Sequence, residues 1–217
     1  MSDIQLRQNV LDELEFEPSI NAAHIGVTVE DGVVTLTGHL SSYAEKIAAE
    51  KAVRRVKGVR AIAEEIEVRY PGQKQTSDDE IAKRALNIFQ WDTFLPHENI
   101  RLTVHKGLVT LTGEVQWYFQ KSGAEKAIRK LSGVIGVVND ITVKPAAKVA
   151  NVKSKIEDAL KRHAEVEAER IQITVLNDEV TLNGKVASWD ERQAVITAAW
   201  SAPGVRLVED HLTIGKW

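Results

Sequence analysis

The sequence predicts an α+β fold built from three tandem αββαβ domains, each a small three-stranded mixed sheet with two helices packed on it. Three segments that begin at His24, Asn99 and Arg170 align without a gap and share the pattern V/L-T-L-x-G. Two sets of glycines repeat at the same intervals of 75 and 71 residues: Gly38, Gly113 and Gly184, then Gly58, Gly133 and Gly204. Matching text at fixed intervals is the signature of a repeated unit, so the fold reduces to that of one unit.

A β-hairpin forms the centre of the predicted unit. In the first copy, Ile25, Val27 and Val29 alternate with polar residues, which is typical of a half-buried strand. A turn follows at 31–32, because aspartate and glycine tolerate the positive φ of a tight hairpin. The second strand ends at the repeated glycine, where we expect a bulge or a close backbone approach. The other copies carry the equivalent strand residues Ile100, Leu102, Val104, Ile171, Ile173 and Val175.

Helical spacing appears on both sides of the hairpin. After it, Ala48, Ala49, Ala52 and Val53 follow a period near 3.6, which predicts a helix covering one face of the sheet. We expect the second set of glycines to cap this helix in the left-handed conformation, before a third strand that ends at residues such as Ile66. A shorter helix precedes each hairpin, with these apolar residues on one face in the later copies: Ile81, Ala85, Ile88, Phe89, Val152, Ile156, Ala159 and Leu160.

Linkers separate the units at 71–77 and near 145–148, where proline and small or polar residues interrupt both periods. We therefore expect domains at 1–70, 76–145 and 147–217. Units of about 65 to 70 residues bury a modest fraction of their surface, so packing between copies is expected to add stability.

Composition excludes several classes of protein. The chain has 28 Lys and Arg against 31 Asp and Glu, a net charge of -3, so no global field attracts nucleic acid or an acidic membrane. The lack of cysteine excludes disulfides and thiolate chemistry. The N-terminus carries acidic residues where a secretory signal needs a basic start, and no apolar run is long enough to span a bilayer. We expect a soluble or peripheral protein, cytoplasmic as written, or periplasmic if a signal was removed.

The repeated unit resembles the BON domain of bacterial osmotically inducible and nodulation-associated proteins. The resemblance rests on the hairpin pattern V/L-T-L-x-G-x-V/L, the glycine before the last strand and the ending VVNDITV of the middle copy. The family usually has an asparagine before that strand; Asn139 fits, whereas Glu64 and Asp210 take its place in the outer copies. The resemblance implies a non-enzymatic binding or scaffolding role, associated with phospholipid, the cell envelope and osmotic or other stress tolerance.

No pattern for catalysis or metal binding emerges from the residues. The six histidines form no HxxxH or HExxH pair, and no phosphate-binding glycine motif is present. Ser41 and Ser42 lack the context of a nucleophile and suit a helix N-cap. Glu64 and Glu65 are neighbours on a strand, so they point to opposite faces. We predict no catalytic residue, no metal, no cofactor and no nucleic-acid partner.

Aromatic residues concentrate in the middle copy. The candidate site for lipid or a protein partner consists of Trp91, Phe94, Trp117, Tyr118, Phe119 and Lys121. Residues 71–145 contain 10 basic and 8 acidic residues, so this copy has a net charge of +2, against -4 before it and -1 after it. One interpretation is a surface for anionic phospholipid or an envelope protein. The other is that the rings pack against neighbouring copies or a second subunit in a homo-oligomer.

Overall fold

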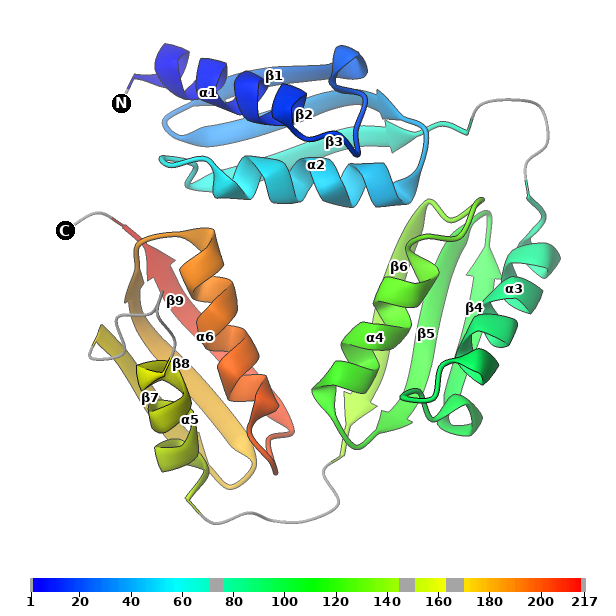
Figure 1. Cartoon of the computed structure of the whole chain (residues 1–217), viewed down its shortest axis with the longest axis vertical. Helices are drawn as coiled ribbons and strands as arrows, with labels where there is room; N and C mark the ends of the chain where they lie inside the picture. Colours follow the sequence, from blue (N-terminus) through cyan, green and yellow to red (C-terminus); the bar gives the residue numbers. More distant parts are fainter. Residues whose placement is uncertain (1, 71–75, 145–150, 163–169, 216–217) are drawn as a thin grey trace. The chain divides into compact units, whose positions relative to one another are not determined.

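The computed structural model of the protein describes residues 2–70, 76–144, 151–162 and 170–215. It contains three sheets of three strands, each with two accompanying helices, in the order helix, strand, strand, helix, strand (Figure 1). The prediction of three small α+β units with mixed sheets is confirmed. Within the described residues, no helix has both the length and the apolar content needed to cross a bilayer.

The elements repeat in the same order in all three copies. The first copy consists of α1 (Asp3–Phe16), η1 (Ala22–His24), β1 (Ile25–Glu30), β2 (Val33–Leu40), α2 (Tyr43–Arg55) and β3 (Ala61–Val68). The second consists of α3 (Asp78–Trp91), η2 (His97–Asn99), β4 (Ile100–His105), β5 (Leu108–Val115), α4 (Tyr118–Ile128) and β6 (Gly136–Val143). The third consists of α5 (Val152–Lys161), β7 (Ile171–Leu176), β8 (Glu179–Val186), α6 (Trp189–Ser201) and β9 (Leu207–Ile214).

Each sheet is mixed because its two connections differ in length. In the first copy, β1 and β2 are joined by a two-residue turn and pair antiparallel, with Val27 opposite Leu36. The chain then passes through α2 before β3, and this longer crossover brings β3 alongside β2 in parallel, as such a connection requires. The third copy has the same order and the same two pairings.

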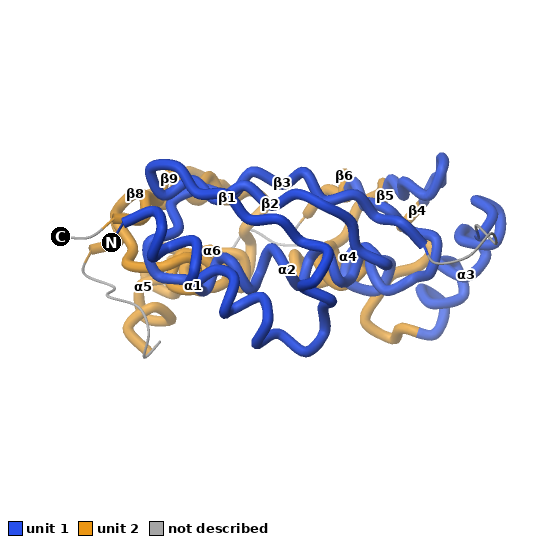
Figure 2. The backbone as a smooth tube through the Cα atoms, turned by 90° about the horizontal axis from the view of Figure 1, so that it is seen from above, with its two compact units in different colours: residues 1–91, 102–110, 125–138 blue, residues 92–101, 111–124, 139–217 orange. Residues whose placement is uncertain are grey.

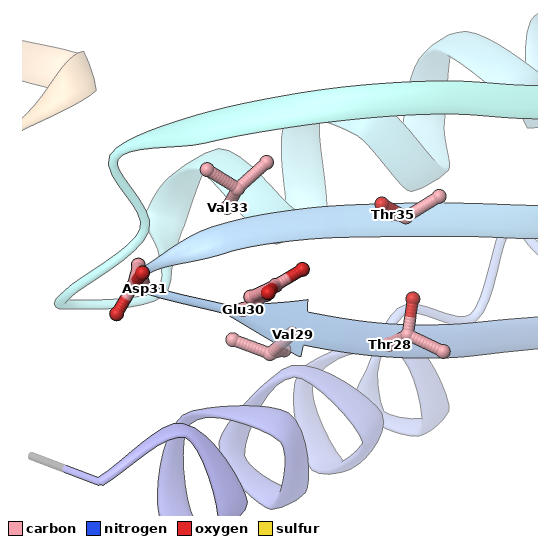
Figure 3. A pocket seen from close by; sticks show the side chains of 6 residues that line it. All are labelled: Thr28, Val29, Glu30, Asp31, Val33 and Thr35. Atoms are coloured by element: carbon pink, nitrogen blue, oxygen red, sulfur yellow. The ribbon is translucent and has the colours of Figure 1, made fainter.

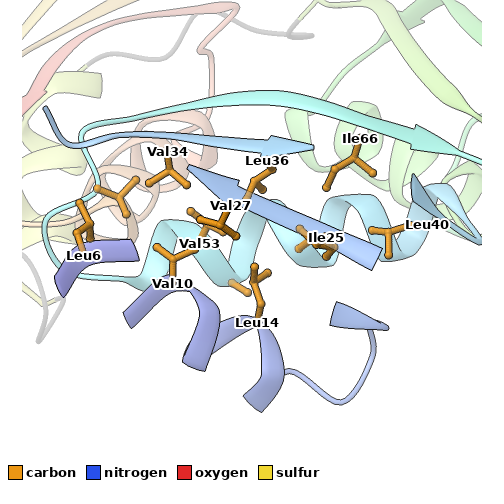
Figure 4. Close-up of a cluster of buried hydrophobic side chains, with 13 residues drawn as sticks. Leu6, Val10, Leu14, Ile25, Val27, Val34, Leu36, Leu40, Val53 and Ile66 are labelled. Atoms are coloured by element: carbon orange, nitrogen blue, oxygen red, sulfur yellow. The ribbon is translucent and has the colours of Figure 1, made fainter. Parts of the chain in front are cut away.

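The core lies between the helices and one face of each sheet. In the first copy, Val10 and Leu14 of α1 meet Val27 and Leu36 of the hairpin, and Val53 closes the cluster from α2 (Figure 4). Burying a side chain of this size contributes about 1.5 to 3 kcal/mol. Each first helix presents three buried residues at i, i+4 and i+8: Leu6, Val10 and Leu14; Ile81, Ala85 and Phe89; Val152, Ile156 and Leu160.

The repeated glycines occupy positions where the backbone has a positive φ. At Gly38 (φ +115°), a Cβ would stand 2.0 Å from the carbonyl oxygen of His24, so the two strands approach too closely for a side chain. Gly58 (φ +102°) differs from the predicted helix cap, because α2 already ends at Val56 as its capping residue. Gly58 instead occupies the third position of the next turn, closed by the bond from Val59 N–H to the Val56 carbonyl at 3.3 Å, where glycine supplies the positive φ.

In the first two copies, an aspartate at the start of the helix that precedes the hairpin binds the hairpin turn. The carboxylate of Asp78 accepts hydrogen bonds from the N–H groups of Lys106 at 2.8 Å and Gly107 at 2.9 Å. Asp3 makes the same pair of bonds in the first copy. These bonds hold the pKa of the Asp78 carboxyl below its usual range, with Gly107 contributing most.

By the density of its contacts the chain divides into two compact units (Figure 2). Unit 1 comprises residues 1–91, 102–110 and 125–138, and unit 2 comprises residues 92–101, 111–124 and 139–217. The division therefore runs through the middle repeat, although that repeat forms its own three-stranded sheet.

Candidate functional site

Three exposed aromatic residues lie in the part of the middle copy that belongs to unit 2. Phe94 lies in the loop after α3, Trp117 precedes α4, and Phe119 is in the first turn of α4. Their exposed fractions are 71%, 40% and 53%, which is unusual for rings of this size. The Phe94 and Phe119 rings meet edge to face, with centroids 6.3 Å apart at 83°. We call Phe94, Trp117 and Phe119 the aromatic surface.

Gln120 ties together the two segments that carry these rings. Its side-chain oxygen accepts hydrogen bonds from the N–H groups of Gln116 and Trp117, both at 3.1 Å. Its side-chain nitrogen donates to the carbonyl oxygen of Phe94 at 3.2 Å. One amide therefore joins the backbone of the loop that carries Phe94 to the backbone of the helix start that carries Trp117 and Phe119.

The start of α4 departs from the corresponding helices in the outer copies. There, the N-cap residues are Ser42 and Ser188, whose hydroxyls accept from the N–H of Glu45 at 3.2 Å and of Glu191 at 3.1 Å. These are capping boxes, in which a serine at the N-cap faces a glutamate three residues later, and the predicted capping role of Ser42 is confirmed. Trp117 occupies the aligned position in the middle copy and has no side-chain oxygen to serve as a cap.

A buried leucine seats the loop beneath the aromatic surface. Leu95 is buried next to the exposed Phe94, and its Cδ2 atom would lie 3.5 Å from a Cβ built on Gly123 in α4. On the other side of the loop, the Asp92 carboxylate accepts from the Phe94 N–H at 2.9 Å. The loop is thus anchored by packing and hydrogen bonds while its phenylalanine ring stays in solvent.

The other two aromatic residues of the predicted site do not join this surface. Tyr118 is half-buried and its ring stacks on that of Trp200 within unit 2, with centroids 4.3 Å apart at 12°. Trp91 is 87% exposed at the last residue of α3 and belongs to unit 1. Lys121 is half-buried, one turn into α4. The aromatic surface is therefore smaller than the sequence predicted. The bonds of Gln120 that support it were not predicted.

The BON domain model matches residues 2–70, 77–145 and 148–216, which together cover nearly the whole chain. The chain belongs to the BON domain family. Among curated proteins it is similar to Osmotically-inducible protein Y of Escherichia coli (strain K12), with 28% identity over 153 residues, covering 66% of this chain and 74% of that protein.

Solved structures of CdsD, a structural protein of the type III secretion system of Chlamydia trachomatis, also align with the chain. One shares 13% identity and covers 97% of this chain and 92% of its own, with a TM-score of 0.27. The C-terminal domain of CdsD shares 12% identity at full coverage of both chains, again with a TM-score of 0.27. A TM-score this low does not establish a shared fold.

The asparagine position noted for BON domains has a structural role in all three copies. Asn139 donates from its side-chain nitrogen to the carbonyl oxygen of Lys121 at 2.9 Å, which links β6 to α4. At the aligned positions, Glu64 lies 3.6 Å from Lys46, and Asp210 lies 2.8 Å from Arg192. Burial raises the pKa of Glu64, and the nearby Lys46 ammonium opposes that rise. The outer copies thus use an ion pair where the middle copy uses an amide.

This exchange changes the environment of the lysine in the middle BON copy. Lys121 aligns with Lys46 and Arg192, both of which have a carboxylate partner. In the part of the chain that the structure describes, no carboxylate lies within ion-pair distance of Lys121. Among the described residues, the ammonium group of Lys121, two residues beyond Phe119, therefore has no carboxylate partner.

A shallow hollow at the hairpin of the first BON copy is a weaker candidate. It is lined by Thr28, Val29, Glu30, Asp31, Val33 and Thr35 (Figure 3). These residues come from β1, β2 and the turn between them. The lining contains two carboxylates, Glu30 and Asp31, and no basic side chain. We therefore assign no ligand to this hollow.

Proposed function

We propose that this protein binds anionic phospholipid bilayers through the aromatic surface of its middle BON domain, as a non-enzymatic module of an osmotic or envelope stress response. The link to osmotic stress is supported by the similarity to Osmotically-inducible protein Y. The site is supported by Trp117, since it replaces a serine cap and leaves a large ring in solvent.

The chemistry of the surface suits the boundary between water and lipid. Phenylalanine and tryptophan rings insert among headgroups and upper acyl chains, and exposed cations nearby attract anionic lipid. The middle repeat is the only one of the three with a net positive charge, +2 over residues 71–145. Lys121, one turn into the same helix, is available to a phosphate because it has no carboxylate partner among the described residues.

Tryptophan in place of a serine cap at position 117 lowers stability, which supports a role of Trp117 in binding rather than in folding. Replacing a serine N-cap by a residue that cannot cap typically loses about 0.5 to 2 kcal/mol of stability. In the first copy, Ser19, Ser42 and Ala44 align with Phe94, Trp117 and Phe119. The middle copy therefore carries three large rings where the first copy builds the same fold with small residues.

A vesicle flotation assay tests the proposal. The full chain should float with vesicles that contain phosphatidylglycerol and not with vesicles of phosphatidylcholine alone. A variant carrying the residues of the first copy (Phe94→Ser, Trp117→Ser, Phe119→Ala) should stay at the bottom of the gradient. Trp117→Ser restores a helix cap, so the variant should stay folded. A urea titration of the variant verifies this, and loss of binding can then be assigned to the missing rings.

Phe16→Ala provides a matched control, because Phe16 is an exposed ring at the end of α1 in the first copy. It should leave flotation unchanged. Failure of the unmodified chain to float with anionic vesicles, or equal flotation of the triple variant, would refute lipid binding at this surface.

The alternative occupant of the same surface is a second copy of the chain. Exposed apolar rings also favour self-association, since closed homo-oligomers bury such patches in symmetric interfaces. Light scattering distinguishes the two: a dimer that becomes a monomer in the triple variant, without vesicle binding, would favour the oligomer.

We further propose that the protein acts without chemical turnover. The two phenyl rings and the indole of the aromatic surface, and the Gln120 amide beside them, supply neither a nucleophile nor a general base. Membership of the BON family supports the same conclusion. An enzymatic activity that is lost on substituting a polar residue of the described chain would overturn it.

A further inference from the structure

Two histidine rings stack on the first sheet although they are 15 residues apart in the sequence. The His24 and His39 ring centroids are 4.8 Å apart and the rings are inclined by 22°. The antiparallel pairing of Ile25 with Gly38 explains this, because the next pair outward in the ladder is His24 opposite His39. Side chains directly opposite in an antiparallel pair are close neighbours on one face.

The backbone around this pair is rigid. Gly38 precedes His39 in β2 and pairs with Ile25 of β1, and its missing Cβ lets the His24 carbonyl oxygen approach to 2.0 Å from where that atom would stand. The neighbouring residues Ile25 and Leu40 are buried in the core of the first copy. His24 is the last residue of η1, directly before β1, and His39 lies in β2. The fixed register of these two strands therefore holds both backbone positions, which favours a pre-organised site.

Both rings remain accessible on the face of the sheet that the helices of this copy leave uncovered. His24 is exposed and His39 is half-buried. Within the described residues, neither ring makes a hydrogen bond or an ion pair. The pair is particular to the first copy, because the aligned residues are Asn99 and Glu114 in the second and Arg170 and Lys185 in the third.

We propose that His24 and His39 together bind a divalent transition-metal ion of the kind that imidazole prefers, such as Zn²⁺. A ring nitrogen coordinates zinc at about 2.0 to 2.1 Å, so two nitrogens on one ion lie at most about 4.2 Å apart. In the stacked arrangement the nitrogen lone pairs lie in nearly parallel ring planes, so binding requires the exposed His24 side chain to rotate out of the stack until one nitrogen of each ring faces the ion. Imidazole nitrogen is a ligand shared by zinc, copper and nickel, and Zn²⁺ is the probe with which we define the test.

Water completes the coordination. Glu67 is paired with His39 across β2 and β3, but its carboxylate is bound by the Arg69 guanidinium at 2.6 Å. No cluster of three or more histidine, cysteine or acidic ligands occurs among the described residues. The site is thus an open two-histidine chelate, which suits reversible surface binding rather than the closed, fully protein-ligated site that structural zinc requires.

Isothermal titration with ZnCl₂ tests the inference, using the full chain without a histidine tag after treatment with a chelator. We expect saturable binding of one ion per chain. His24→Asn introduces the residue that the second copy has at this position, and His39→Asn removes the other ligand; each should abolish the saturable phase. His105→Asn, at an exposed histidine on β4, should leave it unchanged.

Two outcomes overturn the inference: the unmodified chain shows no saturable uptake, or either single variant retains it. Circular dichroism melts of the two variants show whether they stay folded, and nitrogen chemical shifts of both imidazoles should move together on adding zinc. The triple variant of the aromatic surface should bind zinc normally, so this test is independent of the proposed lipid function.

Discussion

The carboxylate of Asp78, the first residue of α3, accepts a hydrogen bond from the backbone N–H of Lys106 at 2.8 Å. A second bond comes from Gly107, so one side chain satisfies both N–H groups of the hairpin turn. A helix residue therefore fixes a turn 28 residues later in the chain, and the same relationship recurs between Asp3 and the turn of the first copy. This contact lies outside the hydrophobic core. Because it depends on the ionised carboxylate of Asp78, the stability of the hairpin should depend on pH.

Asp78→Asn should lower the urea midpoint of unfolding at neutral pH, because the amide offers one acceptor where the carboxylate offers two. The hydrogen bonds from Gly107 and Lys106 lower the pKa of Asp78 in the folded protein. A lowered folded pKa means that the stabilisation is complete above the unfolded value of about 3.9 and is lost as the pH falls through the folded one. The midpoints of the two proteins should therefore converge below about pH 4.

Asp79→Asn provides the control for this titration. Asp79 is the next residue of α3 and forms an exposed pair with Lys83 at 2.8 Å, which contributes little at the surface. Its urea midpoint should match that of the unmodified protein at neutral pH. A gap between Asp78→Asn and the unmodified chain that does not begin to narrow as the pH falls below about 4 would show that the carboxylate charge is not the cause.

Trp117→Ser should stabilise the middle domain while weakening its binding to vesicles. The serine hydroxyl restores the N-cap of α4, and Gln120 already occupies the third helical position that completes a capping box. The expected gain is about 1 kcal/mol in the free energy of unfolding, measured by urea titration. A substitution that raises the free energy of unfolding but weakens vesicle binding indicates a residue that serves binding and not folding.

Trp91→Ser is the comparison, since Trp91 is a still more exposed ring at the last residue of α3. It removes a tryptophan without creating a cap, so the free energy of unfolding should change by less than about 0.5 kcal/mol. An equal gain from both substitutions would mean that loss of an exposed ring, and not capping, is responsible.

The repeat, the hairpins and the order of elements could be predicted from sequence because each depends on a local pattern. The alternation of apolar residues such as Val27 indicates which face of a strand is buried. Gly38 indicates a backbone conformation that other residues rarely adopt. The position of Gly58 was predicted less well, because the end of α2 depends on tertiary packing of Val53 as much as on the glycine. Helix ends are set by such competition and not by one residue.

The candidate site was predicted in composition but not in geometry. Phe94, Trp117 and Phe119 were identified as aromatic irregularities, whereas Tyr118 packs against a ring 82 residues later, which no local pattern indicates. The role of Gln120 was recognisable only by aligning it with Glu45 and Glu191 as the third residue of a capping box. The stacking of His24 on His39 was missed because it arises from the register of a hairpin and not from a metal-binding spacing.

Gly123→Ala should stabilise α4 by about 0.5 to 1 kcal/mol, because glycine is a poor helix former in a helix interior. The added Cβ would lie 3.5 Å from Leu95 Cδ2, an ordinary van der Waals distance. Ala48 and Ala194 already occupy the aligned positions in the outer copies. Thermal or urea unfolding measures the gain.

Gly113→Ala supplies the contrast within the same copy. Its Cβ would stand 2.0 Å from the Asn99 carbonyl oxygen at a φ of +131°, so both a backbone clash and conformational strain result. The protein should lose stability by clearly more than Gly123→Ala gains. If Gly123→Ala were also destabilising, the loop at Leu95 would have to be packed more tightly than the 3.5 Å distance indicates.

Gln120→Ala should loosen the aromatic surface without removing any ring. The substitution removes two hydrogen bonds to the start of α4 and the one bond to the Phe94 carbonyl. At about 0.5 to 1.5 kcal/mol for each bond, and allowing for solvent that replaces part of them, the expected loss of stability is about 1 to 3 kcal/mol. Amide hydrogen exchange at Phe94 and Trp117 should accelerate, and vesicle binding should weaken because the rings are no longer held together before contact. Gln90→Ala, at an exposed position on α3, should change neither measurement. Unchanged exchange at Phe94 in Gln120→Ala would mean that Leu95 and Asp92 alone hold the loop, and the pre-organisation of the surface would then rest on packing instead of on this amide.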